Sequence, residues 1–203
     1  MLTEGLTYPV TVQDEALVKK ICIGSLLLVS APLIVPFLLY LGYCYRLIET
    51  ISNEEDSLPS FSNISQLLYH GTKLAVIFIL YGSGLAILIW TVLSLTGLLQ
   101  ILTAILSVIV YTLIVHLTPL MLYTYVQTDS IRSVFNFSTL LRKSISYKYT
   151  YITVLMSFVY PLIFGLVQGV FILTLVGVIC IPAIIFWQTI SQSYVLAQIQ
   201  QLS

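Results

Sequence analysis

Long apolar runs alternate with short charged segments along this chain. Charged residues occur only at positions 4–20, 46–56, 73, 129–132 and 142–148. Between them lie three long charge-free stretches, Ile21–Tyr45, Leu74–Thr128 and Tyr149–Ser203. A helix that crosses a bilayer needs about 20 mostly apolar residues, so each of the two longer stretches can hold two spans. The pattern predicts an all-α protein, a polytopic membrane helix bundle.

The stretch Ile21–Tyr45 is open to two interpretations. It forms either a tight helical hairpin that turns at Ala31–Pro36, or a single span. In the hairpin all Lys and Arg residues lie on one side of the membrane, which satisfies the positive-inside rule; in the single span Lys19 and Lys20 lie opposite the others. The weakness of the hairpin is its length, because a helix from Lys19 to Leu33 is shorter than a hydrocarbon core of about 30 Å. We expect six helical segments, with five as the alternative, and both termini in the cytoplasm.

The charged loops, residues 46–73 and 129–148, are each expected to hold a short interfacial helix. Apolar residues recur there at helical spacing, in the first loop at Phe61, Ile64, Leu67 and Leu68, and in the second at Ile131, Val134, Phe137 and Leu141. The spans are expected at residues 74–95, 98–125, 151–168 and 169–197. Residues 1–20 form an N-terminal polar segment, and residues 1–203 a single membrane domain.

A short motif occurs three times, with an aromatic residue four positions after a proline. The pairs are Pro36 with Tyr40, Pro119 with Tyr123, and Pro182 with Phe186. The repeat predicts three helix pairs in which the second helix carries the proline. Broken helices form substrate sites in some transporters. The plainer interpretation is a tolerated kink, whose freed backbone groups find other partners.

Few polar groups lie inside the predicted spans. His116 has no intramembrane carboxylate partner in the sequence, so a hydrogen bond to a neighbouring helix is favoured over a proton relay. Gln188 and Gln192 lie four residues apart and share a helix face, either bonding between helices or lining a polar path. Gly165 and Gly169 form a GxxxG pattern, interpreted as packing within the bundle rather than a dimer face.

The composition argues against several classes of function. Charged residues make up 8% of the chain, against about 25% in soluble proteins. The net charge of zero offers no basic field for nucleic acid. The cysteines, Cys22, Cys44 and Cys180, are too far apart in sequence for a metal motif. No nucleotide-binding or catalytic motif is present, so we expect no enzyme, no cofactor and no metal.

Several short motifs occur in an order typical of a known family. They are Tyr8-Pro9, Pro36, Gly42-Tyr43, Leu58-Pro59-Ser60-Phe61, Gly71, Pro119, Phe135-Asn136-Phe137, Tyr151, Gly177 and Pro182. The chain resembles the domain-of-unknown-function family 4013, small multi-pass membrane proteins found largely in archaea. The resemblance covers nearly the whole chain and implies an archaeal cell-membrane protein. It carries over no catalytic residue, because the family defines none.

The leading functional hypothesis is a non-catalytic structural or accessory subunit that packs with membrane lipid or with partner membrane proteins. The alternative is a small transporter or lipid-handling protein. That alternative predicts that His116, Pro119 and Gln188 line one cavity.

Overall fold

The computed structural model describes residues 2–12, 14, 16–55 and 57–198, and every regular element in that part is helical. The all-α prediction is confirmed. Three helices precede the first long hairpin: α1 (Leu2–Thr11), α2 (Leu17–Val29) and α3 (Ile34–Ser52). The remaining elements are α4 (Ile64–Ser94), α5 (Gly97–Thr128), α6 (Ile131–Val134), α7 (Phe137–Ser144), α8 (Tyr147–Val154), the π-helical segment η1 (Leu155–Val159), α9 (Tyr160–Ile172) and α10 (Leu175–Ala197).

Among the described residues, five helices are long and apolar enough to cross a membrane. They are α3, α4, α5, the continuous helix Lys148–Ile172 formed by α8, η1 and α9, and the part of α10 from Gly177 to Ala197. The first apolar stretch is a hairpin, as we favoured, because α2 and α3 are joined by a short turn after Val29. However, α2 has 13 residues and is about 20 Å long, so it is too short to span. The six helical segments that we expected are therefore present, and all of them except α2 are long and apolar enough to cross a membrane.

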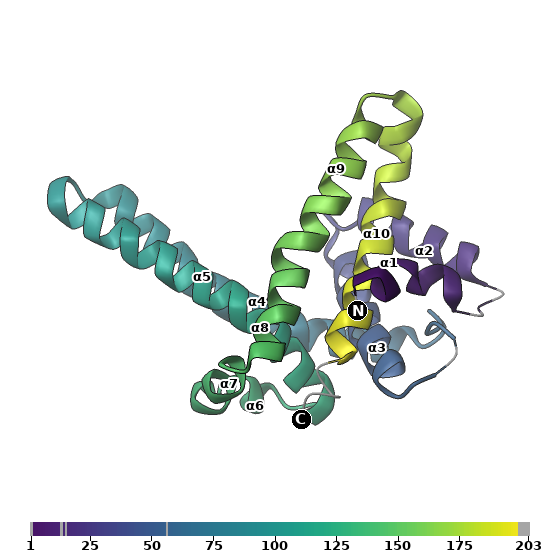
Figure 1. Cartoon of the computed structure of the whole chain (residues 1–203), viewed down its shortest axis with the longest axis horizontal. Coiled ribbons are helices and arrows are strands. Elements are labelled where there is room, and N and C mark those ends of the chain that lie inside the picture. Colours follow the sequence, from purple (N-terminus) through teal and green to yellow (C-terminus); the bar gives the residue numbers. More distant parts are fainter. Residues whose placement is uncertain (1, 13, 15, 56, 199–203) are drawn as a thin grey trace.

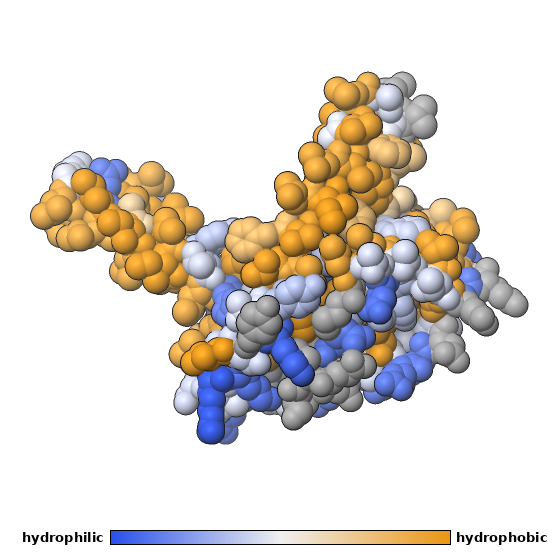
Figure 2. Space-filling model, in the orientation of Figure 1, coloured by the Kyte–Doolittle hydropathy of each residue, from blue (hydrophilic) through white to orange (hydrophobic). Residues whose placement is uncertain are grey.

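Two long helical hairpins, α4–α5 and α9–α10, diverge from a common base (Figure 1). We call the parts of these hairpins that project from the base the arms. The arms are strongly apolar, whereas hydrophilic side chains gather at the base (Figure 2). This agrees with the sequence, in which residues 74–128 and 149–203 carry no charge.

The packed core lies in the base, where α3 meets the ends of the long helices. Its largest fully buried side chains are aromatic: Tyr43, Tyr125, Tyr160 and Phe186. Each long helix contains an apolar window of 18 residues. In α3, 44% of that window is buried within the chain, and in α5, 0% is buried. Packing within this chain is therefore concentrated in the base, and the arms leave most of their side chains uncovered.

The first interfacial helix was predicted wrongly, because its residues form the beginning of α4. The helix runs without a break from Ile64 through the predicted span. Leu67 is buried against α3, and Gly71 lets the two helices approach closely: a Cβ on Gly71 would lie 1.9 Å from the carbonyl oxygen of Leu38. Residues 64–72 thus pack as part of α4 instead of forming a separate surface helix.

The second interfacial helix is divided into α6 and α7. The break falls at Phe135 and Asn136, where the Asn136 side chain accepts a hydrogen bond from the Thr139 N–H at 3.4 Å and caps α7. The division also breaks the predicted apolar stripe. Val134 is buried, whereas Phe137 is exposed.

The last turn lies a few residues later than predicted. The helix α9 continues to Ile172, and the side chain of Thr174 accepts from the Gly177 N–H at 2.9 Å to cap α10. Gly165 and Gly169 lie inside α9, and an added Cβ on either would meet nothing within 4 Å. The prediction that this GxxxG pattern packs within the bundle is wrong. The turn between the spans predicted at 74–95 and 98–125 is confirmed, with Gly97 at a φ of 66°.

The predicted N-terminal polar segment contains a short helix, α1, that packs against α10. The Trp187 side chain donates to the carbonyl of Leu6 at 3.3 Å, and the rings of Tyr8 and Tyr194 stack 4.6 Å apart. These contacts hold α1 beside the C-terminal half of α10. The start of the chain and the end of α10 therefore lie close together.

A buried ion pair joins the segment between α1 and α2 to the loop before α4. The Asp14 carboxylate, 4% exposed, lies 2.7 Å from Lys20 Nζ and accepts from the Leu58 N–H at 3.0 Å. Lys20 Nζ also donates to the Leu58 carbonyl. Burial disfavours the carboxylate form, but hydrogen bonds from Lys20 and from the Ala16 backbone outweigh it. The pKa of Asp14 therefore lies below its ordinary value of 3.8.

We expect acidification to weaken this link. Because the folded pKa of Asp14 is lower than the unfolded one, its stabilisation is complete above about pH 5 and is lost as the pH falls through the folded value. Asp14→Asn should lose roughly 2 kcal/mol at neutral pH and should flatten the acid dependence. Thermal unfolding in detergent, followed by circular dichroism from pH 7 to pH 3, measures both effects. The control is Glu55→Gln, a change in an exposed carboxylate of the loop before α4. Equal acid profiles for the Asp14 and Glu55 variants would contradict the assignment.

Candidate functional site

The proline in α5 is compensated by a side chain from α8. Pro119 is buried inside the helix, and a proline there disturbs the hydrogen bonds of the preceding turn. The Tyr149 hydroxyl donates to the His116 carbonyl at 2.5 Å and accepts from the Leu120 N–H at 3.3 Å. In a regular α-helix these two backbone groups would bond to each other. Tyr149 thus bridges the break and ties α8 to α5.

His116 lies beside this break. Its Nε2 atom is 3.4 Å from the carbonyl oxygen of Ser144 in α7, and its ring meets the Tyr149 ring edge-on at 5.3 Å between centroids. The sequence favoured a hydrogen bond between His116 and a neighbouring helix, and the Ser144 carbonyl in α7 lies where such a partner would be. These contacts bring no carboxylate to His116.

The Gln192 side chain also compensates for a proline, at the π-helical segment. The Tyr160 N–H bonds to the carbonyl of Leu155, five residues back. In that register the Met156 carbonyl would bond to residue 161, which is a proline and has no N–H. The Gln192 side chain supplies the missing donor, with Nε2 3.1 Å from the Met156 carbonyl oxygen. This contact joins α10 to η1.

The remaining residues singled out from the sequence occupy unrelated places. Pro36 lies in the first turn of α3, where a helix needs no N–H. Pro182 lies inside α10 and is half-buried, and half-buried Gln188 forms no side-chain hydrogen bond within the described chain. The three prolines of the proposed repeat therefore take three different positions in their helices.

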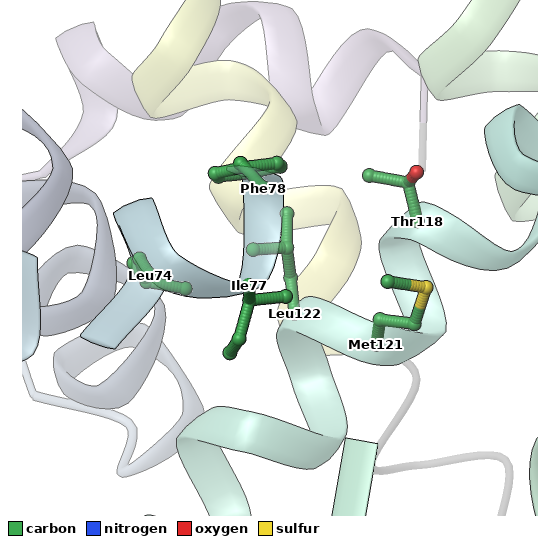
Figure 3. A pocket seen from close by; sticks show the side chains of 6 residues that line it. All are labelled: Leu74, Ile77, Phe78, Thr118, Met121 and Leu122. Carbon is green, nitrogen blue, oxygen red and sulfur yellow. The ribbon is translucent and has the colours of Figure 1, made fainter. Parts of the chain in front are cut away.

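Three cavities of the described chain are lined by residues other than His116, Pro119 and Gln188. The one nearest to Pro119 is a crevice between α4 and α5, with a volume of about 10 Å³. Figure 3 shows that its walls are formed by Leu74, Ile77, Phe78, Thr118, Met121 and Leu122. Such a space barely admits one water molecule. That His116, Pro119 and Gln188 line one cavity stays a prediction of the transporter alternative.

A charged and aromatic cluster at the base of α3, α4 and α5 was not predicted. Asp129 ends α5 in a left-handed conformation, with a φ of 45°. Its carboxylate lies 3.0 Å from Lys73 Nζ and 3.4 Å from His70 Nδ1. The His70 ring stacks on Tyr45 at 3.9 Å, and Lys73 Nζ lies 4.2 Å from the centre of the Tyr69 ring. The only sequence signal was the isolated positions of His70, Lys73 and Asp129 at the ends of apolar runs.

This cluster acts as a clamp between the two helices of the α4–α5 hairpin. Residues 73 and 129 are far apart in sequence, but their ion pair closes the hairpin at its base. A partly desolvated cation beside aromatic faces is stabilised where solvent is scarce. Among the described residues, no group of three His, Cys, Asp or Glu side chains could hold a metal ion.

Removing the Tyr149 hydroxyl should destabilise the protein. Tyr149→Phe leaves the His116 carbonyl and the Leu120 N–H unpaired, at a cost of about 1–3 kcal/mol. In a Pro119→Ala background those two groups can bond to each other, so the same change should cost less; this is a double-mutant cycle. Thermal unfolding of the four proteins gives the coupling. Tyr151→Phe, which changes a more exposed ring on the same helix, is the control. If the stability losses of Tyr149→Phe and Pro119→Ala are additive, the Tyr149 hydroxyl does not compensate for Pro119.

The two glutamines of α10 should differ in importance. Gln192→Leu leaves the Met156 carbonyl without a donor and should cost about 1–3 kcal/mol. Gln188→Leu, one turn earlier, removes no described hydrogen bond and should change stability by about 0.5 kcal/mol at most. Chemical unfolding in detergent compares the two variants. Equal losses would remove the assigned role of Gln192.

Comparison with known proteins gives one match. The family model described as "Protein of unknown function (DUF4013)" matches residues 25–181. No curated protein and no solved structure shows significant similarity to the chain. The matched region begins in α2 and ends in the first turns of α10, so it includes α3, the α4–α5 hairpin and α9. The chain therefore belongs to the DUF4013 family, whose function is unknown.

Proposed function

We propose that this protein is a non-catalytic structural or accessory subunit of the cell membrane, and that it packs with lipid and with a partner membrane protein. The observation that supports this role is the arrangement of the two arms. They diverge from the base and present apolar side chains along their length (Figure 2). Trp90 on α4 is 74% exposed and Phe158 in η1 is 67% exposed.

Physical chemistry explains why such arms suit an accessory role. Lipid tails are as apolar as leucine, so helices associate in a bilayer through close packing and hydrogen bonds. The two arms diverge and do not pack closely against each other (Figure 1). Their glycines at 82, 84, 165 and 169 face open space. A second polypeptide could pack closely against those small residues, and lipid would cover what remains.

The orientation follows from the charges. The arms belong to the charge-free stretches, which contain no Lys or Arg, so the basic residues lie in the base and its loops. The positive-inside rule assigns that side to the cytoplasm. The contact of α1 with the C-terminal half of α10 supports the same side for the start of the chain and the end of α10.

A lipid-handling protein is the second candidate, because one cavity favours it. An apolar hollow of about 420 Å³ lies between α2, α9 and α10. It is lined by Ile21, Phe164, Val167, Cys180, Ala183, Ile184 and Trp187. Hydrophobic walls of this kind fit an acyl chain. The hollow has no charged group, so it would select for chain shape and not for the headgroup.

Photo-crosslinking from the arms tests the proposed role. Trp90 and Phe158 are replaced, one at a time, by benzoylphenylalanine, which preserves an aromatic side chain. After illumination in the native membrane, we expect one protein adduct of constant mass and a fixed ratio in native mass spectrometry. Replacement of buried Tyr43 is the control and should give internal products only. Lipid adducts alone from both arms would contradict the accessory role. A single lipid species retained near Trp187 would favour lipid handling.

A further inference from the structure

The net charge of zero conceals a division between the two charged loops. Residues 46–73 carry two basic and four acidic residues. Residues 129–148 carry one acidic residue, Asp129, and four basic residues, Arg132, Arg142, Lys143 and Lys148. The second loop is thus a basic surface, which runs from the end of α5 through α6 and α7 to the start of α8.

The basic residues of this surface are not neutralised within the described chain. Asp129 is already engaged by Lys73 and His70. None of the four basic residues forms an ion pair with another described residue, and all four are exposed. Their charge is therefore available to an external anion.

The helix α7 also presents an uncovered apolar row. Leu140 and Ser144 are buried and fix the orientation of the helix on the base. Phe137, Leu141 and Ile145 recur every four residues and are exposed, Ile145 to 81%. Arg142 and Lys143 lie between them in sequence. An exposed apolar row flanked by basic residues is the pattern of a helix that lies in the membrane interface.

An open hollow beside this row offers hydrogen-bond donors. It has a volume of about 690 Å³ and is lined by Ser130, Arg132, Ser133, Phe135 and Asn136. The Asn136 side-chain oxygen is used to cap α7, so its amide group remains to donate. The Ser133 hydroxyl already donates to the Ser130 carbonyl, but the Arg132 guanidinium and the Asn136 amide together suit a phosphate oxygen.

We propose that residues 130–148 bind the anionic headgroup of a membrane phospholipid. Arg132 and Asn136 hold the phosphate in the hollow, Arg142, Lys143 and Lys148 attract the anionic surface, and Phe137, Leu141 and Ile145 enter the acyl boundary. Negative lipid in the cytoplasmic leaflet is the partner that complements this combination of charge and apolar surface. The inference requires only that the chain is embedded in a membrane. It holds whether or not the arms have a protein partner.

Native mass spectrometry of the delipidated full chain tests the proposal. The protein is titrated with phosphatidylglycerol or with phosphatidylcholine of the same acyl chains. We expect the first phosphatidylglycerol to bind at least tenfold more tightly. Arg132→Gln should weaken its binding about fivefold, and the triple change Arg132→Gln, Arg142→Gln and Lys143→Gln should weaken it on the order of a hundredfold. Binding should also weaken with added salt, and phosphatidylcholine binding should not change.

Lys19→Gln is the matched control, because it removes one exposed basic residue from α2. Its phosphatidylglycerol affinity should stay within twofold of the wild type. Melting temperatures show that each variant is folded. Equal binding of the two lipids, or equal effects of Arg132→Gln and Lys19→Gln, would overturn the proposal. Displacement of bound phosphatidylglycerol by polyglutamate at low concentration would also overturn it, since the surface would then be a site for acidic protein segments.

Discussion

The close approach of α3 and α4 is the contact on which the rest of the structure depends. A Cβ on Gly42 would lie 1.9 Å from the carbonyl oxygen of Leu67, and one on Gly71 equally close to that of Leu38. Only residues without a side chain allow two backbones to meet in this way. The contact aligns His70 over Tyr45 and leaves Lys73 beside the end of α5. The base of the α4–α5 hairpin is built from this crossing outward.

The base and the arms are stabilised by different means. In the base, buried aromatic rings, an ion pair at Asp14 and hydrogen bonds from Tyr149 and Gln192 fix the helices to one another. The arms contain helices whose backbone groups are largely satisfied internally, which is the condition for crossing a bilayer. They need no further contacts to persist in lipid, and this explains how they can diverge.

The sequence was sufficient for features that depend on local chemistry. Gaps between charges located the long spans, and Gly97 and its neighbours located the turn between α4 and α5. It was insufficient where a distant residue decides the outcome. Residues 64–72 have the apolar spacing of a surface helix, but Gly71 and Leu67 pack them on α3. The partner of the Pro119 break, Tyr149, comes from another element, and no spacing rule relates the two. His70 and Lys73 likewise meet Asp129 only when α4 and α5 pack against each other.

The π-helical segment Leu155–Val159 has a consequence for sequence variation in this protein. A π-turn accommodates one residue more than an α-turn, and one residue corresponds to a rotation of about 100° around the helix axis. Everything before η1 is therefore offset in phase from everything after it. The offset allows one continuous helix to direct Tyr149 at α5 and Phe164 towards α2 and α10. Loss of a single residue from this segment would restore a regular helix and bring the two halves out of register with their neighbours. The helix formed by α8, η1 and α9 therefore tolerates neither the loss nor the gain of a single residue at η1.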